Sequence, residues 1–279
     1  MNEQELALDA WKIRRGIIES TYAAKSGHPG GSLGSAEIFA YLYFNEMNVD
    51  PKNPNKPDRD RFVLSKGHCA PGLYSALALK GYFPWDDLQG LRKIGSHLQG
   101  HPSMKSTPGV DMSTGSLGQG ISAACGMALG AKLNGQNNRV YTLMGDGELA
   151  EGECWEAFMY ATHYKLDNLC VIIDINGLQI DGATKDVMNS EPVDQKMEAF
   201  GFYVITIDGN DIPSLDKAFA EAKNIKGQPT CIIAKTVKGK GVSFMENKAS
   251  WHGKAPNDDE CAEALKEIDA KIAELGGKN

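Results

Sequence analysis

Short apolar runs and helical apolar stripes follow one another along most of the chain. Val140 to Met144 and Leu169 to Ile175 are runs rich in strand-forming residues, and turn residues end both of them. Between them, residues 148–164 are long enough for a helix and carry an apolar stripe. The pattern predicts two buried strands joined by a helix.

Similar segments lie on both sides of this unit. We expect helices over residues 3–25, 35–47, 70–79, 85–93, 117–133, 193–199, 212–224 and 258–275, strands over 61–65, 202–207 and 230–234, and a long loop over 95–120. Strands that alternate with helices are typical of parallel sheets. The sequence therefore predicts an α/β fold with a doubly wound, mostly parallel sheet and helices on both faces. We expect one domain over residues 1–279, with an N-terminal helical extension.

Oxygen donors follow the two central strands directly, because Asp146 ends the first run and Asn176 ends the second. Parallel sheets bind ligands beyond the carboxyl ends of their strands, so both side chains should face one crevice. The turn Gly145-Asp146-Gly147 also fits a dinucleotide fingerprint ending at Ala150. However, the acids Asp146 and Glu148 would repel a pyrophosphate unless a cation intervenes. This charge balance favours a magnesium–diphosphate site, and Gly147 lets the backbone approach it.

Several histidines lie in loops beside glycine or proline, where a core histidine is unusual: His28, His68, His101 and His252. Neutral imidazoles can exchange protons with sugar hydroxyls near neutral pH. Two alternatives stay open, namely an incidental histidine in a helix-ending loop near residue 28 and a plain linker over residues 235–254. His97 we assign to packing within its loop.

Composition narrows the class of protein. The formal net charge of −7 disfavours nucleic acid as a ligand. No charged-then-apolar leader and no bilayer-length apolar run is present, so we expect neither secretion nor membrane insertion. The six cysteines form no Cys-x-x-Cys pair, and we expect buried, reduced thiols. A cytoplasmic enzyme fits these features.

Gly145-Asp146-Gly147 followed by Asn176 resembles the thiamine diphosphate motif, and the flanking sequence is similar to the N-terminal part of transketolases. The resemblance covers nearly the whole chain. It includes Ser26-Gly-His-Pro-Gly-Gly31, Ser65-Lys-Gly-His-Cys69, Gly100-His101-Pro102, Ser113-Thr-Gly-Ser-Leu-Gly-Gln-Gly120 and Trp251-His-Gly-Lys-Ala-Pro256. The family's activity is the transfer of a two-carbon ketol unit between sugar phosphates.

The resemblance implies roles for particular residues. Asp146, Asn176 and the Leu178 carbonyl would hold Mg²⁺, with Ca²⁺ as a substitute. The remaining cofactor contacts would come from Gly147, His68 and His252 at the diphosphate, Ile180 under the thiazolium, and Gly115, Ser116 and Leu117 at the aminopyrimidine. Ser116 departs from the proline of many single-chain relatives, which leaves this loop less rigid.

The catalytic residues implied by the resemblance are His28, His101 and His252, which would contact the ketose donor, and Glu151, which would join a carboxylate network across a subunit interface. A surface helix acid is the alternative for Glu151. The resemblance implies that the family's catalytic glutamate comes from a following pyrimidine-binding domain, which we expect a companion chain to supply.

We therefore expect the N-terminal subunit of a split transketolase, which needs a C-terminal subunit in an α2β2 assembly. A fragment of a longer protein is one alternative. Others are the α chain of a 2-oxo acid dehydrogenase, a deoxyxylulose phosphate synthase, or a non-catalytic module that binds thiamine diphosphate or a nucleotide. The sequence does not specify the acceptor sugar.

Overall fold

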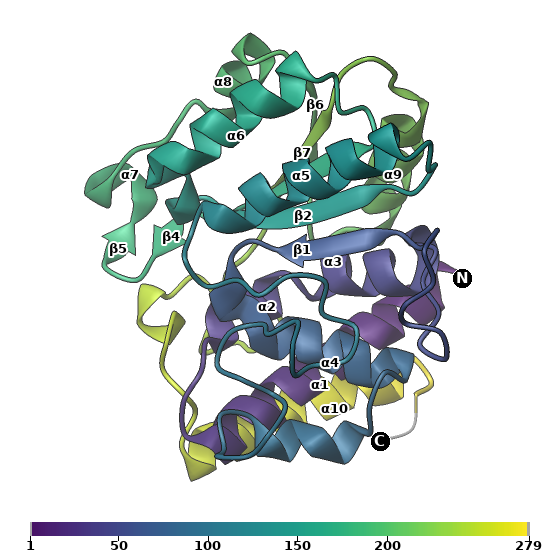
Figure 1. Ribbon diagram of the computed structural model, residues 1–279. Coiled ribbons are helices and arrows are strands. Elements are labelled where there is room, and N and C mark those ends of the chain that lie inside the picture. The colour runs from purple at the N-terminus through teal and green to yellow at the C-terminus, as the bar shows by residue number, and fades with distance from the viewer. Residues whose placement is uncertain (1, 278–279) are drawn as a thin grey trace.

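The computed structural model describes residues 2–277, which form a five-stranded sheet between two layers of helices (Figure 1). Met1, Lys278 and Asn279, which the predicted domain includes, lie outside the described residues. All neighbouring strands of this five-stranded sheet are parallel. In their spatial order, they are β1 (Arg61–Leu64), β2 (Val140–Gly145), β3 (Leu169–Ile175), β7 (Thr230–Lys235) and β6 (Tyr203–Asp208). The predicted doubly wound α/β fold is confirmed.

Helices cover both faces of the sheet. One face packs against α5 (Gln119–Leu133), α6 (Gly152–His163) and α8 (Val193–Ala199). The other face shares a core with α1 (Glu3–Ala24), α3 (Ala36–Tyr41), α4 (Ala70–Lys80), α9 (Ile212–Asn224) and α10 (Asp258–Glu274), of which α10 packs against α1. The crossovers β2–α6–β3 and β6–α9–β7 run in opposite directions across the sheet, so right-handed connections place their helices on opposite faces.

The apolar run of β3 shows why the central strands lack alternation. Cys170 and Ile172 pack into one core, whereas Val171 and Ile173 pack into the other. Successive strand side chains point to opposite faces, and both faces are covered by helices. A continuous apolar sequence is therefore what this strand requires.

The N-terminal helix begins at a capping box, in which the side chains of Asn2 and Glu5 each accept a hydrogen bond from the other's backbone N–H. It ends at Lys25, whose φ of 49° is left-handed. Helix α1 packs against α3, α4 and α10, and Figure 1 shows these helices below the sheet. The extension is thus joined to the main core through one face of the sheet.

The structure corrects one predicted loop, because Pro29–Gly34 forms the buried helix α2. Its glycines permit close packing: a Cβ at Gly30 would lie 2.8 Å from the Trp251 carbonyl oxygen, and one at Gly34 would lie 2.8 Å from that of Val237. Tertiary packing overrides the low helix propensity of glycine here. The segment carrying His28 is consequently held between α1 and the 235–254 loop.

Smaller elements also differ from prediction. The expected helix over 35–47 is α3 followed by a π turn, and Ser35 precedes α3 without a side-chain cap. The hairpin of β4 (Leu178–Gln179) and β5 (Gly182–Ala183) and the short α7 (Thr184–Val187) were not predicted. The remaining turns are η1 (Leu42–Glu46), η2 (Gly67–Cys69), η3 (Trp85–Gly90), η4 (Gly147–Ala150) and η5 (Ala249–Trp251).

Between residues 2 and 277, no helix has the length and apolar character needed to cross a membrane. The six cysteines are buried and unpaired, as the sequence predicts.

The core on the α6 face gives a stability prediction. Phe158 is fully buried and its ring lies 5.5 Å from that of Phe202, whereas the neighbouring Met159 is 55% exposed. We expect Phe158→Ala to lower the free energy of unfolding by about 3–5 kcal/mol because it leaves a cavity. Met159→Ala, the control, should change it by less than about 0.5 kcal/mol in urea unfolding. Equal effects would contradict this packing.

Candidate active site

A cavity of about 280 Å³ lies beyond the carboxyl ends of β1, β2, β3 and β7. Its wall contains residues that directly follow or end these strands, and the 235–254 loop contributes Lys238 and His252. The parallel sheet thus places the cavity where the sequence predicts it, because all four strands end at one edge.

Asp146 forms part of the cavity wall and accepts three backbone hydrogen bonds. The N–H of Gly147 donates to Oδ1 at 2.8 Å, and those of Asn176 and Gly177 donate to Oδ2 at 3.0 and 2.6 Å. Burial, and then the nearby Asp174 carboxylate, raise the pKa of Asp146 to about 6, although the backbone donors oppose this. A cation in the cavity would favour the charged form.

The turn after β3 presents a second group of oxygen atoms. Asn176 donates its Nδ2–H to Asp174 at 3.0 Å, while its Oδ1 accepts the backbone N–H of Leu178 at 3.1 Å. The Leu178 carbonyl accepts a hydrogen bond of 3.0 Å from the ammonium of Lys238. Burial lowers the pKa of Lys238, although nearby acids oppose this effect. This carbonyl therefore already receives a positively charged group.

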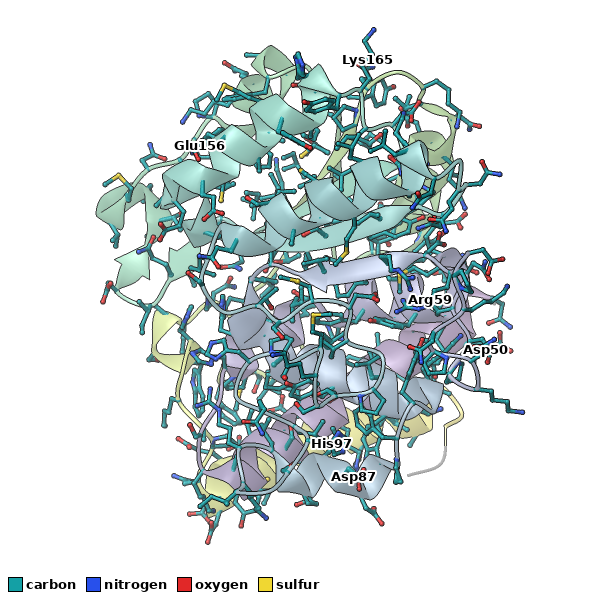
Figure 2. All side chains as sticks on the ribbon, in the orientation of Figure 1. Asp50, Arg59, Asp87, His97, Glu156 and Lys165 are labelled. Atoms are coloured by element: carbon teal, nitrogen blue, oxygen red, sulfur yellow. The ribbon has the colours of Figure 1, made fainter. Side chains whose placement is uncertain are left out.

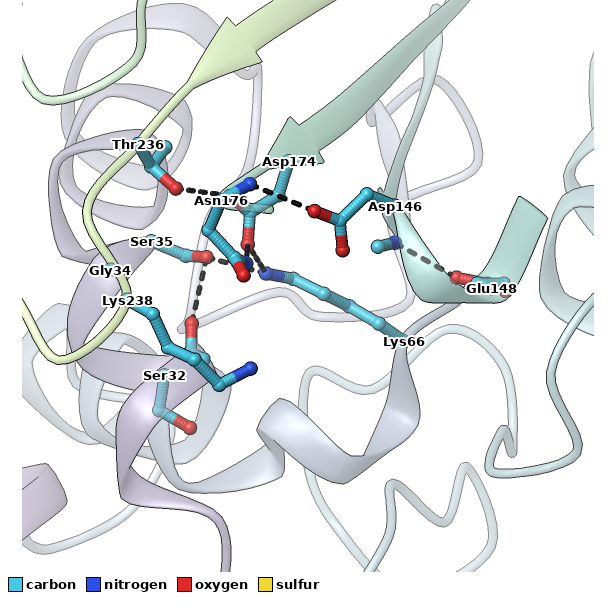
Figure 3. A network of polar contacts seen from close by, with 12 residues as sticks. Ser32, Gly34, Ser35, Lys66, Asp146, Glu148, Asp174, Asn176, Thr236 and Lys238 are labelled. Atoms are coloured by element: carbon cyan, nitrogen blue, oxygen red, sulfur yellow. Dashed lines mark hydrogen bonds and ion pairs between the residues drawn. The ribbon is translucent and has the colours of Figure 1, made fainter. Parts of the chain in front are cut away.

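A buried ion pair between Lys66 and Asp174 lies next to Asn176 (Figure 3). The Lys66 ammonium lies 2.5 Å from Asp174 and also donates to the Ser35 hydroxyl at 2.7 Å. Asp174 additionally accepts from the hydroxyl of Thr236 and the amide of Asn176. Although burial lowers the pKa of Lys66, the attraction of Asp174 raises it above its usual value. The Lys66 ammonium thus stays charged although it is buried.

Four histidines from distant segments meet at one side of the cavity. The ring centroid of His28 lies 5.3 Å from that of His68, 5.4 Å from that of His252 and 6.2 Å from that of His101. His68 and His252 stack with centroids 5.0 Å apart. Among the described residues, the buried Nδ1 atoms of His28 and His252 have no hydrogen-bond partner. They remain able to bind a polar ligand.

These imidazoles are held in the neutral form. Burial is the largest cause, and it lowers the pKa of His28 to about 4 and that of His252 to about 3. The pKa values of His68 and His101 are lowered as well, with burial again the first cause. Nearby cations and the other rings act in the same direction. Neutral rings can both donate and accept a proton.

Known proteins share this combination of sequence and fold. Residues 7–272 match the family model described as transketolase, thiamine diphosphate binding domain. The chain belongs to the transketolase family. The predicted resemblance is confirmed, and so is the thiamine diphosphate-binding class of the domain.

Similar transketolase-family proteins differ in length. The chain is 45% identical to the 6-deoxy-6-sulfo-D-fructose transketolase subunit of Clostridium sp. (strain MSTE9), covering 98% of this chain and all of that subunit. It is 44% identical to an apulose-4-phosphate transketolase subunit of Actinobacillus succinogenes, covering 96% of this chain and 97% of that one. It is 45% identical to the transketolase of Homo sapiens over 96% of this chain, which corresponds to 43% of the human protein.

Solved transketolases have the same fold over this region. The enzyme from Leishmania mexicana superposes with a TM-score of 0.85 at 36% identity, covering 99% of this chain and 46% of that one. The enzyme from Campylobacter jejuni gives a TM-score of 0.84 at 32% identity, covering 99% and 48%. The chain thus spans about half the length of these solved enzymes.

Most residues assigned from the family resemblance are found together. The cavity wall includes His68, Gly115, Leu117, Asp146, Gly147, Asn176, Leu178, Ile180 and His252. His28 and His101 join through their ring contacts. Gly115 has a φ of +145°, and a Cβ there would lie 3.1 Å from the His101 ring, so glycine is needed. Ser116 and Glu151 are exposed and are not among the wall residues found between residues 2 and 277.

Other wall residues were not predicted as site residues, namely Lys66, Asp174, Gln179 and Lys238. Glu148, which the sequence analysis considers only for its charge, also lies in the wall. The sequence offers one signal for such residues, namely the lone carboxylate of Asp174 within an apolar strand, because a buried charge needs a partner. His97 lies apart from the site, as the sequence predicts: its Nε2 is 3.0 Å from Asp87, and Figure 2 shows the two residues together.

The donor set suits a hard divalent cation. Asp146, Asn176 and Leu178 lie in one hydrogen-bonded turn system and offer carboxylate, amide and carbonyl oxygens. Mg²⁺ prefers six oxygen ligands and commonly takes some from phosphates and water. No group of three or more His, Cys, Asp or Glu side chains within residues 2–277 could hold a metal ion. A cation here would therefore depend on this mixed set together with the cofactor's phosphates.

The histidine cluster gives a pH prediction. We expect His28 and His252 of the ligand-free chain to titrate near pH 4 and pH 3 in NMR spectra of their Cε1–H groups. The unfolded chain should titrate near the ordinary value of about 6.5. Because the unfolded state binds these protons first, the histidine contribution to stability should fall as the pH drops from about 6.5 through 4 to about 3. Midpoints near 6.5 in the folded chain would contradict the burial of the rings.

Proposed function

We propose that this chain is the cofactor-binding subunit of a split transketolase. It transfers a two-carbon ketol unit from a ketose phosphate, such as xylulose 5-phosphate, to an aldose phosphate, such as ribose 5-phosphate, together with a C-terminal subunit. The observation that carries this proposal is the meeting of four neutral histidines with the Asp146–Asn176 turn at one strand-end cavity. A transfer between sugars needs both the cofactor-binding turn and the groups that exchange protons with the sugar.

In this proposal Asp146, Asn176 and the Leu178 carbonyl hold Mg²⁺ against the cofactor's diphosphate, and Ca²⁺ can substitute. Gly147 and His68 contact the diphosphate, Ile180 supports the thiazolium, and residues 115–117 contact the aminopyrimidine. The ammonium of Lys238 supplies further positive charge, since it lies 3.0 Å from the Leu178 carbonyl. The support is that all of these groups except Ser116 lie in one cavity wall.

When bound, thiamine diphosphate supplies the nucleophilic carbon that takes up the two-carbon unit. The protein's own contribution is to orient the sugar and to move its protons. Neutral His28, His101 and His252 accept and donate protons at the donor's hydroxyl groups. Their lowered pKa values keep these rings uncharged across the neutral range.

The end of the donor sugar that lies away from the transferred two-carbon unit can carry different anions. The similar subunits are named for 6-deoxy-6-sulfo-D-fructose and apulose 4-phosphate, so a sulfonate or a phosphate terminus is consistent with this subunit type. Because these relatives match over nearly their whole length, the names favour a companion chain that completes the enzyme. We assign to it the pyrimidine-binding domain, the catalytic glutamate and the terminal-anion contacts, in an α2β2 assembly. Glu151, exposed just before α6, would lie at a subunit interface.

The test mixes this chain with its candidate companion, Mg²⁺ and thiamine diphosphate, and measures ketol transfer from xylulose 5-phosphate, sulfofructose and apulose 4-phosphate. We expect activity only in the mixture, on at least one donor. Asp146→Ala should reduce it by at least about 100-fold, because a metal-ligating carboxylate is lost. The exposed Asp259→Ala should leave it unchanged.

Three outcomes would count against the proposal. Release of carbon dioxide from pyruvate without sugar exchange would indicate a different thiamine diphosphate enzyme. Cofactor binding in a mixture that is inactive on every donor would indicate a non-catalytic module. An active Asp146→Ala variant would remove the assigned metal site.

A further inference from the structure

The side chain of Glu148 is a buried acid that the proposed chemistry does not use. The residue is 2% exposed and follows Asp146 by two positions. Its Oε1 accepts hydrogen bonds from the Ser65 hydroxyl at 2.5 Å and the Gly118 N–H at 3.0 Å. Its Oε2 accepts the Gly145 N–H at 3.1 Å, a contact drawn in Figure 3. Three donors thus share one carboxylate.

These donors come from three different segments. Ser65 follows β1, Gly145 ends β2, and Gly118 immediately precedes α5 with a left-handed φ of +88°. Ser65 is itself an acceptor for the Ile121 N–H at 3.1 Å. A Cβ at Gly120 would lie 2.6 Å from Ser65, so the start of α5 is pressed against the end of β1. The carboxylate therefore connects the start of α5 to both strand ends.

The neighbouring residues 115–117 belong to the cavity wall through Gly115 and Leu117. Apart from Glu148, their attachments to the body include the hydrogen bond from Thr114 to the Leu64 carbonyl at 2.7 Å. Thr114 thus attaches the N-terminal end of this short segment, and Glu148 attaches the C-terminal end through Gly118. Burial raises the pKa of Glu148, whereas the hydrogen bonds from Ser65, Gly118 and Gly145 stabilise its charged form and oppose this shift.

We propose that Glu148 is a positioning residue that fixes the location of residues 115–117 in the cavity wall. It thereby controls the fit of the cofactor's aminopyrimidine but not that of its diphosphate. This inference rests on the proposed function, which places the aminopyrimidine against this segment. Its physical basis is that a carboxylate offers only acceptors, so all three donors can be satisfied at once. A glutamine would turn an N–H group towards at least one of them.

The first experiment measures amide hydrogen exchange of the full chain without ligand. In Glu148→Gln, residues 113–122 should exchange at least about tenfold faster than in the wild type, because the hydrogen bond from the Gly118 N–H either is lost or loses its charged acceptor. Peptides from β6 and α9 should be unchanged. Glu198→Gln, the same change at an exposed position on α8, is the control and should alter neither region.

The second experiment compares two ligands in the presence of Mg²⁺ by calorimetry. Thiamine diphosphate reports on both ends of the cavity, whereas inorganic pyrophosphate reports on the metal and diphosphate end alone. Glu148→Gln should raise the Kd for thiamine diphosphate by about tenfold and leave the Kd for pyrophosphate within about twofold. Ser65→Ala, which removes one donor and keeps the carboxylate, should give a smaller shift in the same direction.

The outcomes separate this inference from the proposed function. If the wild type binds pyrophosphate but not thiamine diphosphate, the proposed function fails, while the exchange experiment still tests the attachment of residues 113–122. Equal weakening of both ligands in Glu148→Gln, or in Ser65→Ala if the first variant does not fold, would show a general structural role and overturn the inference. Unchanged exchange and unchanged affinity would overturn it as well.

Discussion

The buried pair of Lys66 and Asp174 is the interaction on which the cavity depends. It joins the ends of β1 and β3, and Asp174 also holds the side chains of Asn176 and Thr236. By accepting the Asn176 amide N–H, Asp174 fixes the direction of the amide oxygen. Its charge also raises the pKa of Asp146. Two opposite charges, each too costly to bury alone, therefore organise the oxygen donors at the strand ends.

Burial has a second effect at the histidine cluster, where it lowers the pKa values of all four rings and keeps them neutral. His28 and His252 come from opposite ends of the chain, yet their ring centroids are 5.4 Å apart. Cations nearby, such as Lys238, add to the cost of protonation. The site thus combines a turn of oxygen donors with a wall of uncharged imidazoles. The proposed ketol transfer uses both kinds of group.

The glycines at Gly30, Gly34 and Gly120 help to build the site because they let neighbouring segments pack closely, rather than because they are flexible. Gly30 and Gly34 let α2 pack directly on the backbone of the 235–254 loop, which brings His28 beside His252. Gly120 allows the start of α5 to lie against Ser65. The Glu148 carboxylate then binds donors that these contacts bring together. Small residues in the motifs are therefore part of the construction of the site.

The sequence by itself determined the α/β class, the two central strands and the positions of Asp146 and Asn176 at their ends, because apolar runs and turn residues are local signals. Its motifs also indicated the transketolase family and the four histidines of the cluster. Only the tertiary structure decided that residues 29–34 form a helix, that Lys66 pairs with Asp174, and that Glu148 binds Ser65, Gly118 and Gly145. Apart from the contact between Glu148 and Gly145, these contacts join residues far apart in the chain, and their energies depend on burial, which local sequence patterns do not show.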